Sequence, residues 1–230
     1  MKLAKKLMRI VPAMFLYGLG VYFIIQADIG LAPWEAFNAG CSKALGMPYG
    51  DFVLLSGLVI LGIDVLLKEK IGIGTVINTI MIGKVVDLLQ FLKIMPKVSN
   101  FYVGIVVLIV GQFIICFATY LYISAGLGSG PRDSLMVALG KRLPKVPIGT
   151  IRGLLEGAVL LIGWSLGAKV GLGTVLAVLS VSLIMQFTFK IMHFEVREVR
   201  HESIAETLFS LRKPQPDCER KKTTTFTTSE

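Results

Sequence analysis

Charged residues are scarce in this 230-residue chain. Asp, Glu, Lys and Arg make up 17% of it and hydrophobic residues 54%, whereas soluble domains carry about a quarter charged residues. Two histidines and three cysteines are present, with no CxxC or HExxH pattern. An ordinary soluble domain is therefore excluded. We expect no cofactor, no metal site and no catalytic residues, because no nucleophile–base set or metal motif appears.

Because charged residues are scarce, the chain contains long apolar runs. The stretches "IVPAMFLYGLGVYFIIQA" and "FYVGIVVLIVGQFIICFATYLYI" contain no Asp, Glu, Lys or Arg. Runs of about 18 or more such residues are long enough to cross a bilayer as helices. The chain is thus expected to be an all-α polytopic membrane protein in contact with the lipid bilayer. We predict six spans, at about residues 7–27, 52–67, 75–95, 101–123, 148–167 and 172–191.

The two halves of the chain resemble each other. The segment "YFIIQADIGLAPWEAF" (22–37) aligns with "YLYISAGLGSGPRDSL" (120–135), and "KIGIGT" (70–75) recurs as "KVGLGT" (169–174). Each half reads as a span, a Gly/Pro-rich segment, a second span, a GxGT turn and a third span.

A unit with three spans leaves the membrane on the side opposite to its entry, so its second copy runs upside down. We therefore predict two inverted repeats, at 1–95 and 96–192, as in many transporters and some channels.

Basic residues indicate the orientation. The chain has 24 Lys and Arg against 15 Asp and Glu, and membrane proteins concentrate Lys and Arg on cytoplasmic loops. We attribute the excess to topology and expect no nucleic-acid partner. Placing the N-terminus inside puts most loop Lys and Arg on the cytoplasmic side, so both termini are predicted to be cytoplasmic. Residues 193–230 read as a basic cytoplasmic tail, partly disordered.

The Gly/Pro-rich segments are the candidate functional site. Each opens with glycine and reaches a proline, a residue that favours the first position of a helix. Short helices are therefore predicted to begin near Pro33 and Pro131. Inversion brings their N-termini, which carry free N–H groups, from opposite sides toward the membrane midplane, where they can bind a solute. The candidate solute site consists of Gly30, Pro33, Trp34, Glu35, Gly128, Pro131, Arg132 and Asp133.

Local roles compete with this site. Glu35 and Asp133 fall in a first helical turn, where a carboxylate satisfies N–H groups without any solute. Arg132 fits an ordinary cytoplasmic loop residue, and Trp34 an anchor at the membrane interface. We favour each of these local roles, residue by residue. The sequence leaves open whether the Pro-led helices enter the bilayer or lie on its surface.

Four charges fall within the predicted spans, where ionisable residues are costly and often functional. Lys84 and Asp87 lie three apart on one helix face, and Arg152 and Glu156 lie four apart. Each couple either serves function or forms an intrahelical ion pair that stabilises the fold, and the sequence leaves both open. Lys84 and Asp87 are expected to pair. The same fifth span carries Gly153-x-x-x-Gly157 and Gly163-x-x-x-Gly167, two patterns of close helix packing within the fold or between copies in a homo-oligomer.

The motifs "GLAPWEAF", "GSGPRDSLM" and the paired GxGT turns resemble the YczE/YyaS/YitT family of bacterial integral membrane proteins, and its YczE-type branch most closely, over about residues 7–192. The resemblance implies a place in the bacterial cytoplasmic membrane. It supplies no activity and no site residues. From the residues we expect a small-solute or ion transporter or channel with its site between the repeats. The alternative is a non-transporting accessory or regulatory protein that acts through a partner.

Overall fold

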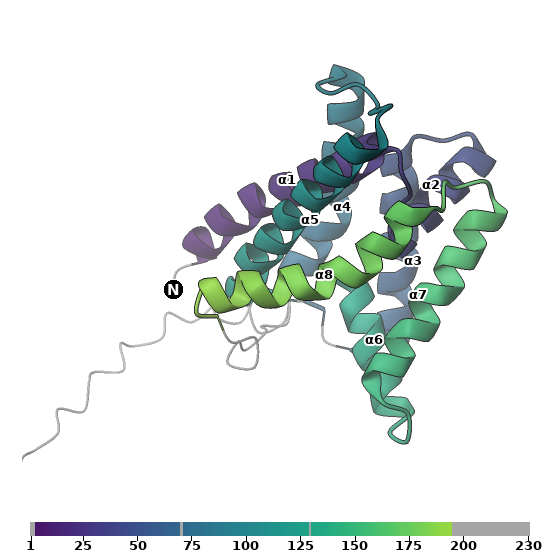
Figure 1. The fold of residues 1–230 in the computed structure, drawn as a ribbon. Coiled ribbons are helices and arrows are strands. Elements are labelled where there is room, and N and C mark those ends of the chain that lie inside the picture. The colour runs from purple at the N-terminus through teal and green to yellow at the C-terminus, as the bar shows by residue number, and fades with distance from the viewer. Residues whose placement is uncertain (1–2, 70, 129, 195–230) are drawn as a thin grey trace, which may run out of the picture.

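The structure is a computed structural model that describes residues 3–69, 71–128 and 130–194. Over these residues the chain is helical and contains no strand (Figure 1). The all-α prediction is confirmed, and a helix occupies each of the six expected spans. Most of the predicted tail, residues 195–230, lies outside the described part. The helices are α1 (Leu3–Ala27), α2 (Pro33–Leu45), α3 (Tyr49–Leu66), α4 (Ile73–Leu92), α5 (Phe101–Ser124), α6 (Pro131–Arg142), α7 (Ile148–Ser165) and α8 (Leu172–Ile191).

Several of these helices suit a membrane. Five of those in the described residues, α1, α3, α4, α5 and α8, are long and apolar enough to cross a bilayer. The chain is therefore a membrane protein that crosses the bilayer several times and contacts lipid. The expected fifth span, α7, is an 18-residue helix that is not among these five, so the count of six spans stays a prediction.

The first helices of the two halves, α1 and α5, pack against each other at the centre. A Cβ atom added to Gly20 would lie 2.6 Å from the carbonyl oxygen of Gly111, and one added to Gly104 would lie 2.8 Å from that of Ala27. Only small residues permit such close backbones. Because later residues of α1 meet earlier residues of α5, the two helices run antiparallel. In addition, α4 packs on α1, and α8 packs on α5.

Each short Pro-led helix packs on a long helix from the other half. Helix α2 lies against α7, and α6 lies against α3. A Cβ atom added to Gly163 of α7 would lie 2.5 Å from the carbonyl carbon of Ala36 in α2. The two halves therefore interlock and do not form separate bodies.

The GxGT turns join the halves by two equivalent contacts. The N–H of Gly74 donates to the carbonyl oxygen of Leu127 at 2.8 Å, and the N–H of Gly173 donates to that of Ile29 at 3.0 Å. Helices α4 and α8 begin at these turns. Each turn thus docks on the segment that precedes the Pro-led helix of the other half, which explains why the motif occurs twice.

Gly30 and Gly128 lie in the segments on which the two GxGT turns dock. Their φ angles are +132° and +120°, values that residues with a side chain rarely adopt. A Cβ atom at Gly30 would also lie 2.8 Å from Thr174 Oγ1, and one at Gly128 would lie 2.5 Å from Thr75 Oγ1. Both conformation and space therefore require glycine at these two positions.

Candidate functional site

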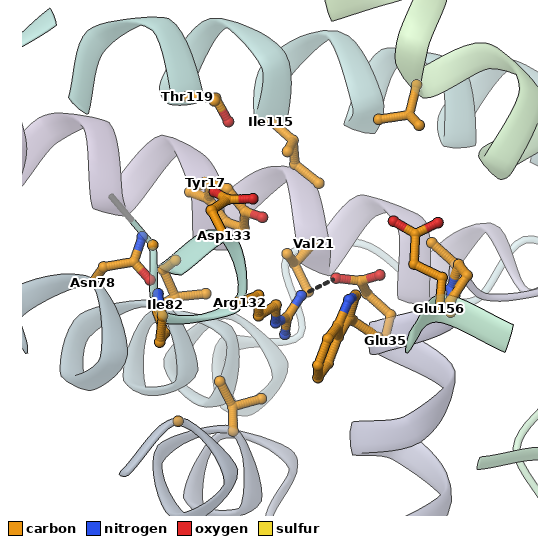
Figure 2. Close-up of a pocket in the computed structure, with 18 of the residues that line it drawn as sticks. Tyr17, Val21, Glu35, Asn78, Ile82, Ile115, Thr119, Arg132, Asp133 and Glu156 are labelled. Carbon is orange, nitrogen blue, oxygen red and sulfur yellow. Dashed lines mark hydrogen bonds and ion pairs between the residues drawn. The ribbon is translucent and has the colours of Figure 1, made fainter. Parts of the chain in front are cut away.

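A cavity of about 200 Å³ lies among the helices, and all eight contribute residues to its wall. Of the eight residues predicted to form the solute site, six line it, whereas Gly30 and Gly128 dock the GxGT turns nearby. The segments that sequence reasoning singled out are thus brought together around one space (Figure 2). The six residues are Pro33, Trp34, Glu35, Pro131, Arg132 and Asp133.

Both Pro-led helices begin where the sequence predicts. Helix α2 starts at Pro33 and α6 at Pro131, each preceded by a residue in extended conformation. The first N–H groups of a helix have no partner within it. The preceding residues, Ala32 and Gly130, supply no side-chain acceptor. Two helix N-termini from different halves therefore face the same cavity.

An ion pair links these two N-termini. Arg132 Nη1 donates to Glu35 Oε1 at 3.4 Å (Figure 2), and the guanidinium carbon lies 4.8 Å from the centre of a Trp34 ring. The Arg132 side chain is 28% exposed and that of Glu35 only 9%. Charge-assisted hydrogen bonds are usually 2.7–2.9 Å long, so this pair is a loose one. The Arg132 and Trp34 side chains stack on each other in the cavity wall, a contact that the cytoplasmic-side role favoured for Arg132 and the interfacial role favoured for Trp34 did not include.

The two carboxylates of the Pro-led helices have partners on other helices. Glu35 accepts from Arg132 of α6, and Asp133 accepts a weak hydrogen bond from the Tyr122 hydroxyl of α5 at 3.4 Å. Both carboxylates therefore make contacts beyond their own helical turn, and the local capping role favoured from the sequence stays a prediction. Their placement follows from the packing of the two halves, which a single helical turn does not reveal.

A second ion pair lies on the wall formed by α7. Arg152 Nε donates to Glu156 Oε1 at 2.8 Å, and both residues line the cavity. An intrahelical ion pair was one of the two alternatives for these residues, and this contact is of that kind. Pairing of this kind lowers the cost of placing both charges in a helix surrounded by apolar residues.

The other expected pair is wrong. Lys84 forms its ion pair with Asp51 of α3, and Asp87 Oδ1 accepts the backbone N–H of Gly50 at 2.7 Å. The cause is the position of α3, whose first turn lies against the middle of α4 and presents free N–H groups and a carboxylate there. Neither Lys84 nor Asp87 belongs to the described wall of the cavity.

The cavity is closed differently on its two sides. On one side α3 packs tightly on α4, since a Cβ atom on Gly50 would collide with the backbone of Gly83. On the other side α7 and α8 diverge from the turn that joins them (Figure 1). A Cβ atom on Gly149, the counterpart of Gly50, meets no described atom within 4 Å. Both α7 and α8 nevertheless line the cavity.

The small-residue pattern of α7 therefore lacks the packing expected within the fold. Around Gly153 and Gly157 the described structure places no atom within 4 Å of an added Cβ. Gly163, further along the same helix, does pack closely, on α2. Of the two expectations for the first pattern, packing between copies of the chain is the one that stays a prediction.

A family model described as "Family of unknown function (DUF6198)" matches residues 4–190. The chain belongs to this family. It is 31% identical over 171 residues to the uncharacterized membrane protein YczE of Bacillus subtilis (strain 168), covering 74% of this chain and 78% of YczE. It is also 31% identical over 179 residues to an uncharacterized protein of Haemophilus influenzae (strain ATCC 51907 / DSM 11121 / KW20 / Rd), covering 78% and 81%.

Uncharacterized protein YyaS of B. subtilis is 26% identical over 170 residues, covering 70% of this chain and 80% of YyaS. The resemblance to YczE-type proteins is therefore confirmed. No solved structure matches the chain significantly.

Sequence reasoning missed several polar residues in the cavity of this DUF6198 member. Tyr17 and Tyr122 come from the central pair of helices and Tyr49 from α3, while Asn78 and Gln112 come from α4 and α5. The sequence did contain one signal of a polar cavity residue, because Gln112 places a neutral polar amide within a long apolar run. Its amide donates to the carbonyl oxygen of Ala177 at 2.9 Å, so this residue also holds α8 against α5.

Proposed function

We propose that this protein carries a small polar solute or ion across the bacterial cytoplasmic membrane, and that the solute passes through the cavity. The observation that supports this most is the meeting of two Pro-led helix N-termini, one from each half, at a charged cavity. Helix N-termini present unpaired N–H groups, and inverted-repeat transporters bind their solutes at discontinuous helices near the midplane. The role is passage of the solute, not its chemical conversion.

The packing of the two halves supports the inverted relation that such transport needs. The antiparallel crossing of α1 and α5 is what inversion requires of corresponding helices. The reciprocal docking of the two GxGT turns fits the same relation. With the N-terminus inside, six spans return the C-terminus to the cytoplasm, as the distribution of Lys and Arg favours.

The different closure of the two sides suggests how the cavity opens. The α3–α4 side is sealed, whereas α7 and α8 stand apart. In an inverted repeat the two halves can exchange conformations, so that one side opens as the other closes. The state described here would then be one of two related states.

Access to the cavity from both membrane faces tests this proposal. Val178 of α8 lines the cavity, and Leu183 on the same helix is exposed on the outer surface. In a chain with Cys41, Cys116 and Cys218 replaced, V178C should react with membrane-impermeant thiol reagents added to either face. L183C, which we expect to face lipid, should stay unreactive. Reaction of V178C from one face alone, under all conditions, would favour the accessory protein.

A further inference from the structure

Not every charged side chain of the cavity has an ionic partner within the fold. Its described wall carries two guanidinium groups and three carboxylates. Arg132 pairs with Glu35, and Arg152 pairs with Glu156. The carboxylate left over belongs to Asp133, which is exposed toward the cavity. Its described hydrogen bond is the long one from the Tyr122 hydroxyl. The two arginines of the cavity form their described ion pairs with Glu35 and Glu156, and they act on Asp133 only from beyond ion-pair distance.

Aromatic rings accompany this unneutralised carboxylate. Tyr17, Tyr49, Tyr122 and Trp34 all line the cavity. Aromatic faces attract ammonium groups and are used in proteins to surround quaternary amines. Trp34 already stacks against a cation, the guanidinium of Arg132, so the electrostatics of the wall accept positive charge.

The same residues argue against the other kinds of ion. Hard metal cations take six or more oxygen ligands, and the described residues contain no group of His, Cys, Asp or Glu able to hold a metal. Both arginines are already paired, with Glu35 and Glu156, so an anion would have to bind at the helix N–H groups alone or displace one of these carboxylates. The cavity volume of about 200 Å³ equals roughly seven waters at about 30 Å³ each, which suits a small organic molecule.

We propose that the cavity binds a small organic cation whose ammonium group lies against the Asp133 carboxylate and the surrounding aromatic rings. This inference rests on the proposed function for the site, and names the class of solute. The ammonium supplies the direct ionic partner that Asp133 lacks, and the rings supply apolar contact to its methyl or methylene groups. The loose Arg132–Glu35 pair lies beside the site and can adjust to solutes of different shape.

Binding of choline to the purified full-length chain tests this proposal. Its neutral isostere 3,3-dimethyl-1-butanol serves as the matched ligand, and ionic strength is held constant. Choline should bind saturably and the isostere should not. D133N keeps the shape of the side chain and should weaken choline binding by at least about tenfold, because it removes the counter-ion. D51N, which alters a carboxylate outside the cavity, should leave the affinity unchanged.

Equal binding of choline and its isostere, or equal affinity in D133N and the unaltered protein, would overturn the proposal. The proposal is also overturned if neither choline nor a second ammonium probe, tetramethylammonium, binds saturably. If D133N does not fold, a thiol-protection experiment replaces the comparison with this variant. Met136 lines the cavity, and choline should slow the reaction of M136C with a thiol reagent in a C218S chain that retains Asp133. No protection by choline would contradict the site.

The outcomes also separate this inference from transport. Saturable choline binding without access from both membrane faces would keep the cation site and remove the transport proposal. Access from both faces without binding of either ammonium probe would keep transport and remove the cation site.

Discussion

At the scale of single residues, the ion pair between the halves is the contact that organises the cavity. Arg132 comes from α6 and Glu35 from α2, and each sits in the first turn of its helix. Their attraction holds together two helix N-termini that would otherwise present partial positive charge to each other. Glu35 therefore has a structural reason to be acidic, independent of any solute.

Neutralising one member of this pair should strand the other charge. We expect R132Q or E35Q to lower the free energy of unfolding by roughly 1–3 kcal/mol, because a largely buried charge loses its partner. The double variant should lose less than the sum of the two. Unfolding measured in a mild detergent for all four proteins gives the coupling. Strictly additive losses would show that the 3.4 Å contact contributes nothing.

At the scale of elements, the two halves differ in how their second and third long helices pack, α3 on α4 in one half and α7 beside α8 in the other. Helix α3 touches α4 through backbone at Gly50 and Gly83, and Gly57 adds a contact with Thr79. Helix α7 makes no comparable contact with α8 in the described structure. The sealed side thus depends on glycine, and the open side does not. Gly50 has a glycine counterpart in Gly149, whereas Gly57 and Gly83 correspond to Glu156 and Ser182.

A pair of alanine substitutions at these corresponding positions should behave differently. G50A forces α3 away from α4 and should destabilise the protein by roughly 1–3 kcal/mol, the usual cost of overpacking. G149A meets open space in a helix and should be neutral or stabilise by up to about 1 kcal/mol, since alanine favours helix. Thermal unfolding of both variants checks this. Equal destabilisation would mean that α7 also packs closely in solution.

The sequence alone predicted the structural features that depend on a local residue signal or on a motif present in both halves. A proline at the first helical position is a local signal, so the starts at Pro33 and Pro131 were predicted correctly. The duplicated GxGT motif likewise pointed to a duplicated structural role.

Contacts between distant helices were not predictable in this way. Lys84 was assigned to Asp87 because helical spacing is readable from sequence, whereas the proximity of Asp51 depends on how α3 is positioned along α4. Arg132 was taken for a loop residue because its partner lies in the other half.

At the scale of the whole molecule, the ends of the helices sort into two groups. Lys169 pairs with Asp28, and the side-chain nitrogen of Lys43 would lie 3.3 Å from a Cβ added to Gly167. Lys141 pairs with Glu69. The first set belongs to segments that the proposed topology places outside, and the second to segments placed inside. Each set joins the two halves, so the halves are tied together at both ends of the helix bundle around the cavity.

Distances across the two sides of the cavity test most directly whether the halves exchange conformations. Leu55 and Ile80 are exposed on α3 and α4, and Leu154 and Leu179 are their exposed counterparts on α7 and α8. Spin labels at each pair, read by double electron–electron resonance in lipid, should give two distances per pair. Conditions that shorten the α7–α8 distance should lengthen the α3–α4 distance. A single, unchanging distance on each side would contradict alternating access through this cavity.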